Sequence, residues 1–192
     1  MDIAKRLLGI CAAGVVILIV ILSFGRKPPR SALVGGRAPA FVVINTNGVA
    51  IHLRDMTASP VLLCFWLLHD GAEGTEVVST LDTLARDVEG LPGLLVAAVN
   101  CDASPEEIAE FAKDKDLKCR ILHMGDDPEK LRTITKLYHL DDHELPRFFL
   151  LDSQKDRIAA DLEGRHTAEE LKQAILDANL LPWLTERKED GS

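Results

Sequence analysis

The sequence predicts an α/β sandwich built around a buried central strand. Residues 61–68 form a nearly continuous apolar run behind Pro60, a pattern typical of a strand covered on both faces of a sheet. A polar loop follows at 69–75, and apolar residues from Val77 to Val88 then recur at helical spacing. Further strands and helices, then a hairpin and a closing helix, complete a pattern that indicates the α/β class.

Local signals define the other elements in order along the chain. Asn47-Gly48 separates two short apolar segments and is the strongest short signal for a hairpin. Capping boxes at Ser104/Glu107 and Thr167/Glu170 start two helices, and Asp127-Pro128 starts another. We therefore expect strands at 41–44, 49–53, 61–68, 94–100, 119–123, 147–151 and 157–162, and helices at 74–89, 105–116, 128–140 and 168–178.

The amino-terminal segment is expected to be a membrane anchor. Residues 7–24 form an uncharged apolar run of 18 residues, which is near the lower limit for a membrane-spanning helix. Arg26, Lys27 and two prolines follow in place of a small-residue cleavage site, so we expect the anchor to stay uncleaved. The predicted organisation is an anchor at 1–25, a linker at 26–36, a folded domain at 37–180 and a charged tail at 181–192.

The charge distribution argues against nucleic-acid binding. Residues 1–30 contain five basic residues and one acidic residue, so the remainder contains 17 basic and 29 acidic residues. A nucleic-acid-binding domain needs a basic surface, which this composition does not supply. We expect no nucleic acid among the partners and no cofactor.

Three stretches together resemble the TlpA-like thioredoxin family, in particular its cytochrome c maturation branch. They are the entry segment 32–41, the strand ending in Cys64-Phe65-Trp66, and the segment Glu144-Leu145-Pro146-Arg147 with the apolar strand after it. The resemblance covers about residues 32–178. It implies a thioredoxin-like three-layer sandwich with an amino-terminal hairpin and a helix–strand insertion at 105–123, beside the single transmembrane helix. It also implies a bacterial inner-membrane protein whose domain faces the periplasm or cell exterior.

The resemblance carries one departure that affects function. The two redox cysteines of the family fall on Asp70 and Glu73 of this chain. A Cys-x-x-Cys pair needs one thiolate to attack and a second to resolve the mixed disulfide, and carboxylates do neither. Residues 69–76 contain no cysteine, so no peroxidatic thiol is present there either. We expect a domain that has lost dithiol chemistry at the usual place.

Pro146 matches the cis-proline of the family, which implies that it lies against the loop at 70–73. A groove of this kind can bind an extended peptide through its backbone without any thiol. The residues expected to form this groove are Trp66, His69, Leu145, Pro146 and Arg147. Trp66 is favoured as a buried strand residue, with contact to a partner as the alternative.

Two alternatives concern other side chains. The stretches 69–73 and 143–144 are expected to lie near each other. Their imidazoles and carboxylates are ligands that suit zinc or nickel. This metal hypothesis involves His69, Asp70, Glu73, His143 and Glu144, against the simpler interpretation of a solvated acidic loop.

The second alternative is a redox role for Cys101, which ends a strand beside 61–68. Asp102 follows it, and a negative charge raises a thiol pKa. If the strands at 94–100 and 119–123 run parallel, as the resemblance implies, Cys101 and Cys119 lie roughly 16 Å apart. That separation is beyond disulfide reach, so we expect no disulfide.

Three functions remain open from the sequence. We favour a non-catalytic thioredoxin-like module that is tethered to the membrane through 7–24 and binds a protein or peptide of the cell envelope. The first alternative is a thiol–disulfide oxidoreductase or peroxidase-type redoxin that uses Cys101. The second alternative is a metal-binding domain.

Overall fold

The computed structural model describes residues 32–56, 59–88, 93–141, 144–152 and 157–180. The chain divides into two units, 1–31 and 32–192, and all described residues belong to the second. No helix in these described ranges is both long enough and apolar enough to cross a membrane. The predicted anchor at 7–24 and the charged tail at 181–192 lie outside the described residues.

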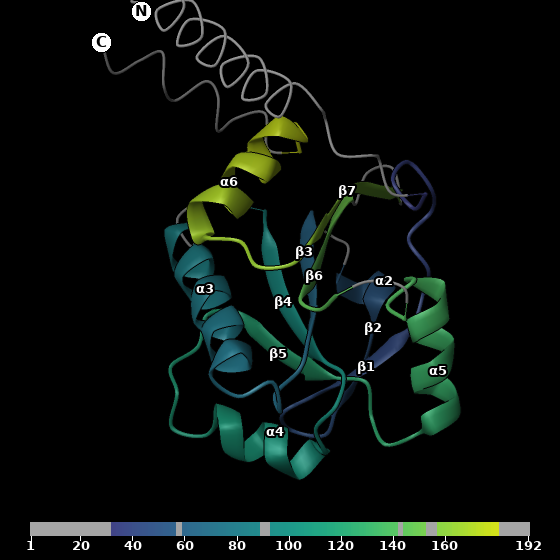
Figure 1. The fold of residues 1–192 in the computed structure, drawn as a ribbon, viewed down its shortest axis with the longest axis vertical. Helices are drawn as coiled ribbons and strands as arrows, with labels where there is room; N and C mark the ends of the chain where they lie inside the picture. Colours follow the sequence, from purple (N-terminus) through teal and green to yellow (C-terminus); the bar gives the residue numbers. More distant parts are fainter. Residues whose placement is uncertain (1–31, 57–58, 89–92, 142–143, 153–156, 181–192) are drawn as a thin grey trace, which may run out of the picture. The chain divides into compact units, whose positions relative to one another are not determined.

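A seven-stranded mixed sheet forms the centre of the second unit (Figure 1). Its strands are β1 (Val42–Asn45), β2 (Ala50–His52), β3 (Val61–Trp66), β4 (Leu95–Asn100), β5 (Arg120–His123), β6 (Arg147–Asp152) and β7 (Arg157–Glu163). The spatial order is β2-β1-β5-β4-β3-β6-β7. Strand β3 runs parallel to β4, and β4 parallel to β5, whereas the other neighbours are antiparallel. The carboxyl ends of β3, β4 and β5 therefore meet at one edge of the sheet.

Helices cover both faces of this sheet (Figure 1). They are α2 (Leu53–Met56), α3 (Ala72–Val88), α4 (Pro105–Ala112), α5 (Pro128–Leu137) and α6 (Ala168–Asp177). One core cluster joins the sheet to α3, α4 and α6, and a second joins it to α2 and α5. Alternate residues of β3 belong to the two clusters, which explains why all six of its residues are buried. The three-layer sandwich expected from the sequence is confirmed.

The observed elements differ from the expected ones mainly at their ends. Both predicted capping boxes are present, at Ser104/Glu107 and Thr167/Glu170. Strand β3 ends at Trp66 instead of Leu68, because the backbone N–H of Leu68 donates to the Asp102 carboxylate and not to a neighbouring strand. Helix α4 ends at Ala112, four residues early, and the short helix α2 was not predicted.

Candidate functional site

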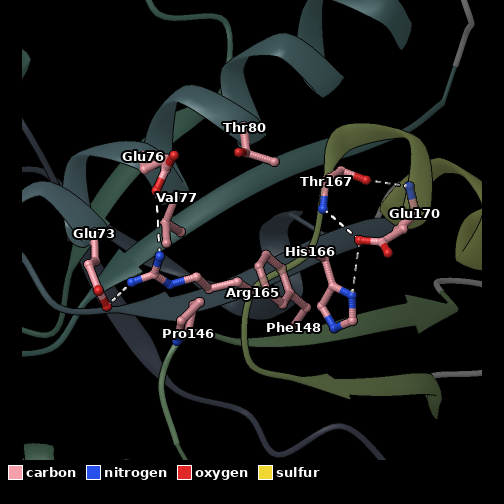
Figure 2. A pocket seen from close by; sticks show the side chains of 10 residues that line it. All are labelled: Glu73, Glu76, Val77, Thr80, Pro146, Phe148, Arg165, His166, Thr167 and Glu170. Atoms are coloured by element: carbon pink, nitrogen blue, oxygen red, sulfur yellow. Dashed lines mark hydrogen bonds and ion pairs between the residues drawn. The ribbon is translucent and has the colours of Figure 1, made fainter.

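A cavity of about 260 Å³ lies between the start of α3, the start of β6 and the loop before α6. The peptide bond between Leu145 and Pro146 is cis, as expected. Pro146 lines the cavity together with apolar, acidic and basic side chains (Figure 2). The lining residues are Glu73, Glu76, Val77, Thr80, Pro146, Phe148, Arg165, His166, Thr167 and Glu170.

Arg165 links the two sides of this cavity. Its guanidinium forms an ion pair with Glu73 and lies 3.7 Å from the Glu76 carboxylate, so it reaches from the loop before α6 to the first turns of α3 (Figure 2). His166 lies 3.7 Å from the carboxylate of Glu170 on the other side. With three carboxylates and one guanidinium in its lining, the cavity carries excess negative charge around an apolar floor made by Pro146, Phe148 and Val77.

Glycines allow α3 to start close to the end of β3. Gly71 has a φ of +65°, a left-handed conformation that glycine adopts without steric cost. A Cβ at Gly74 would lie 2.1 Å from the carbonyl oxygen of Leu67. The helix therefore packs directly on the preceding loop, which fixes Glu73 and Glu76 at the cavity.

Asp102 organises the sheet edge next to this loop. Its carboxylate accepts hydrogen bonds from the backbone N–H groups of Leu68 and His69 at 2.7 and 2.9 Å. It also accepts from the Asn100 side chain at 2.9 Å, while the Asn100 oxygen accepts from the N–H of Ala103 at 2.7 Å. These bonds join the segment after β3 to the segment after β4.

The imidazole of His69 lies between two carboxylates. Its Nδ1 is 3.1 Å from Asp102 and its Nε2 is 3.2 Å from Glu107 of α4. Both ring nitrogens donate at once only in the protonated ring. The hydrogen bond to Glu107, followed by the charge of Asp102, raises the pKa of His69 above its ordinary value. The pKa of Glu107 is lowered, first by its bonds to Ser104 and then by His69.

The structure brings together only part of the expected groove. Pro146 and Glu73 line one cavity, in agreement with the expectation that the proline lies against the 70–73 loop. Asp70 is exposed and does not line it. Leu145 packs instead against the core cluster beneath α2 and α5. His69 turns towards Asp102 and Glu107 and does not line this cavity.

Two further groove predictions are corrected by burial. Trp66 is 1% exposed, and its ring packs 5.5 Å from that of Phe111 in α4. The favoured interpretation of Trp66 as a buried strand residue is thereby confirmed. Arg147 is 2% exposed and forms a two-pronged ion pair with Asp161 at 2.9 and 2.6 Å. It also donates to the carbonyl oxygens of Tyr138 and His139, so it holds the fold together and cannot contact a partner.

The three cysteines in the described part of the chain are free thiols. Burial raises the pKa of Cys101 to about 12, with a further contribution from Asp102, although the Trp66 hydrogen bond opposes it. Burial likewise raises the pKa of Cys119 to about 12 and that of Cys64 well above its usual range. Cys101 follows the end of β4 and Cys119 precedes β5, so the parallel register places them at opposite ends as predicted. None of the three thiols has the lowered pKa of a nucleophile.

The metal hypothesis gains no geometric support from the described residues. His69, Asp70, Glu73 and Glu144 do not converge, and no group of three or more described histidine, cysteine or acidic side chains could hold a metal ion. The backbone N–H of Glu144 donates to Glu163, on β7. His143 lies outside the described residues.

Sequence reasoning missed the residues that complete the site. Asp102 and Glu107 have a usable signal, because both follow β4 and the carboxyl ends of neighbouring parallel strands share an edge. Arg165 and His166 precede the capping residue of the last helix, and no local pattern connects them to α3. Their role depends on the path of β7, which brings the loop before α6 to the cavity.

The mixed sheet, its helical layers and the cis-proline facing the first turn of α3 define a thioredoxin-like domain. The chain belongs to the AhpC/TSA family, whose model matches residues 34–158. None of the curated proteins matches the chain.

Solved structures share this fold. A putative thiol:disulfide interchange protein DsbE from Chlorobium tepidum is 25% identical, with 77% of this chain and 99% of that chain covered and a TM-score of 0.62. StoA from Bacillus subtilis is 21% identical over 71% of this chain and 96% of its own, with a TM-score of 0.54. Copper-bound ScoI from Arabidopsis thaliana is 12% identical over 74% and 98%, with a TM-score of 0.62, and shares the fold.

Proposed function

We propose that this domain is a thioredoxin-like binding module that has lost dithiol exchange and holds an extended protein segment in the cavity beside Pro146. The observation that carries the proposal is the Glu73–Arg165 ion pair at that cavity. Glu73 lies on the first turn of α3, beside the cis-proline, at the position matched to the second redox cysteine of TlpA-like proteins. A charged pair therefore occupies the place where that family performs sulfur chemistry.

The alternative is thiol–disulfide exchange through a non-standard cysteine. A structural relative from Bacteroides is named as a thiol:disulfide interchange protein, which favours it. The side chains argue against it, because Cys64, Cys101 and Cys119 all have raised pKa values and none lines the cavity beside Pro146. The binding module is thus the better-supported function.

We further propose that residues 7–24 tether the module to the bacterial inner membrane, with the domain on the periplasmic side. The support is the uncharged apolar run of 18 residues and its separation from the domain by a segment rich in proline, glycine and arginine. The partner would then be an envelope protein, with cytochrome c maturation as the family-based suggestion.

The proposal is tested by filling the cavity. Peptides selected from a random displayed library against the domain would be titrated by calorimetry against Thr80→Trp, which places a large ring in the cavity. Thr83→Trp, on the same helix but outside the cavity, is the matched control. We expect Thr80→Trp to weaken peptide binding at least about tenfold, the equivalent of about 1.4 kcal/mol, with little effect from the control.

Two results would contradict the proposal. Equal binding by wild-type protein and Thr80→Trp would remove the cavity from recognition. A covalent mixed disulfide between the protein and cysteine-containing selected peptides would restore the redox interpretation.

A further inference from the structure

A second cavity, of about 370 Å³, lies where the β1–β2 hairpin meets the segment that leads from α4 into β5. Asn45, Thr46 and Ile51 line it from the hairpin, and residues between Ala112 and Leu122 line it from the other side. It shares no lining residue with the cavity beside Pro146. The second cavity is therefore a site distinct from that of the proposed function.

Strand β5 has an open edge at this cavity. Arg120 and Ile121 pair with Ala97 and Ala98 of β4 on one side. Strand β1 pairs only with Leu122 and His123 on the other side. Among the residues that the structure describes, Arg120 and Ile121 thus have no strand partner on the β1 side. Such an edge presents backbone donors and acceptors that an extended chain can pair with.

The sequence of the hairpin creates this opening. The side-chain oxygen of Asn45 accepts from the backbone N–H groups of Asn47 and Val49 at 3.0 and 2.9 Å. The N–H of Asn45 donates to the carbonyl oxygen of Val49 at 3.0 Å. The turn therefore starts at the last β1 residue that pairs with β5, and the chain leaves the sheet edge before reaching Ile121. The gap beside β5 is fixed by these hydrogen bonds.

The lining of the second cavity is basic in an acidic protein. Lys115, Lys118 and Arg120 line it, and none of its described lining residues is acidic. The whole chain, by contrast, has 30 acidic and 22 basic residues. The Lys115 amine lies 3.4 Å from the ring centroid of Phe111, so its position is held by a cation–π contact.

Two carboxylates of this region contact Arg86 of α3. Asp82 accepts from Arg86 at 2.9 Å and from the backbone N–H of Lys118 at 2.5 Å. Asp116 lies 3.7 Å from the same Arg86 guanidinium. Asp82 is itself a residue of α3, and neither acid lines the cavity.

We propose that the second cavity and the open edge of β5 form a docking site for an extended acidic segment of a partner protein. The segment adds a short strand beside Arg120 and Ile121, and its carboxylates lie against Lys115 and Arg120. A cavity of this volume accommodates side chains of the added strand, while backbone pairing supplies the rest of the binding.

A synthetic octapeptide of alternating glutamate and valine is the probe for this site. We expect it to bind the full-length protein and to shift the amide resonances of Arg120 and Ile121. It should slow hydrogen exchange at Ile121, whose N–H points away from β4, because N–H groups alternate along a strand and that of Met124 donates to Asn100 at the end of β4. Arg120→Glu should raise its Kd about tenfold or more, because attraction becomes repulsion. Arg132→Glu on α5 changes the net charge equally, is exposed and does not line the cavity, so its effect should stay below about twofold. Lys115→Glu repeats the test should Arg120→Glu fail to fold.

Four outcomes would overturn the proposal. A lysine–valine octapeptide that binds as tightly would exclude charge recognition. If Arg120→Glu and Arg132→Glu weakened peptide binding equally, the effect would come from the net charge of the protein and not from this cavity. If inorganic phosphate reproduced the amide shifts and the peptide did not slow hydrogen exchange, the cavity would be a small-anion site. Self-association that the peptide abolishes, measured by sedimentation velocity, would assign the edge to a second copy of this chain.

Discussion

The carboxylate of Asp102 accepts hydrogen bonds from both the backbone N–H and the imidazole of His69. The loop that leaves β3 is thereby tied to the end of β4 at two points on one residue. The carboxylate of Glu107 contacts the second ring nitrogen and so connects the same side chain to α4. The loop that carries Asp70 and leads into Glu73 is therefore anchored by a charged cluster made of His69, Asp102 and Glu107.

This cluster predicts a pH dependence. Because the pKa of His69 is raised in the folded protein, its contribution to stability is present below its ordinary value of 6.5 and is lost as the pH rises through the folded pKa. A proton NMR titration of the ring should give a midpoint above 6.5. Glu107→Gln should lower that midpoint and keeps a helix-capping side chain.

Glu106→Gln is the matched control for that titration, since Glu106 is the preceding residue on the same turn and makes no hydrogen bond with His69. It should leave the midpoint nearly unchanged. A His69 midpoint at or below 6.5, or equal effects of both substitutions, would show that the imidazole is not held between the two carboxylates.

The buried ion pair of Arg147 and Asp161 predicts an asymmetric loss of stability. Both side chains are 2% exposed, so Arg147→Met leaves a carboxylate buried without its partner. We expect the free energy of unfolding to fall by about 3–5 kcal/mol in urea denaturation. The double variant Arg147→Met/Asp161→Leu should recover part of this loss, whereas Arg132→Met on the surface should change stability by less than about 0.5 kcal/mol. A loss no larger than that of the surface control would contradict the buried geometry.

Gly74 predicts a steric effect at the start of α3. Alanine usually favours a helix over glycine by about 1 kcal/mol, but here its Cβ would lie 2.1 Å from the Leu67 oxygen. Gly74→Ala should therefore lower the free energy of unfolding by about 1–3 kcal/mol. Thr75→Ala, exposed on the next position, should be neutral within about 0.5 kcal/mol. Stabilisation by Gly74→Ala would mean that the loop and helix do not pack as described.

The thiols should be inert in the folded protein. In a chain that carries Cys11→Ser, we expect Cys64, Cys101 and Cys119 to react with a colorimetric disulfide reagent only on unfolding, because burial raises their pKa values. Adding Asp70→Cys provides the control, since position 70 is exposed and its thiol should react within the mixing time of a manual assay. Rapid labelling of Cys101 in the folded protein would revive its redox role.

Local sequence signals were sufficient for most of the helices and strands, because these signals agree with one another, whereas the three-layer arrangement followed from the family resemblance. The apolar run of β3, the two capping boxes and the Asn47-Gly48 turn each specify an element without help from distant residues. The site was harder, because its contacts join segments far apart in the sequence. Arg165 forms an ion pair with Glu73, which is distant in sequence. Arg147 forms one with Asp161 on the neighbouring strand. A charged residue next to a cis-proline indicates a groove, but only the strand register reveals that its side chain points into the core.

Reduction of insulin tests the loss of dithiol chemistry most directly. The full-length protein and the double variant Asp70→Cys/Glu73→Cys would be compared with dithiothreitol as electron donor. We expect the unmodified protein to leave the uncatalysed rate unchanged and the double variant to accelerate reduction, because it restores a thiol pair at the start of α3. Turnover by the unmodified protein that Cys101→Ser abolishes would contradict the account.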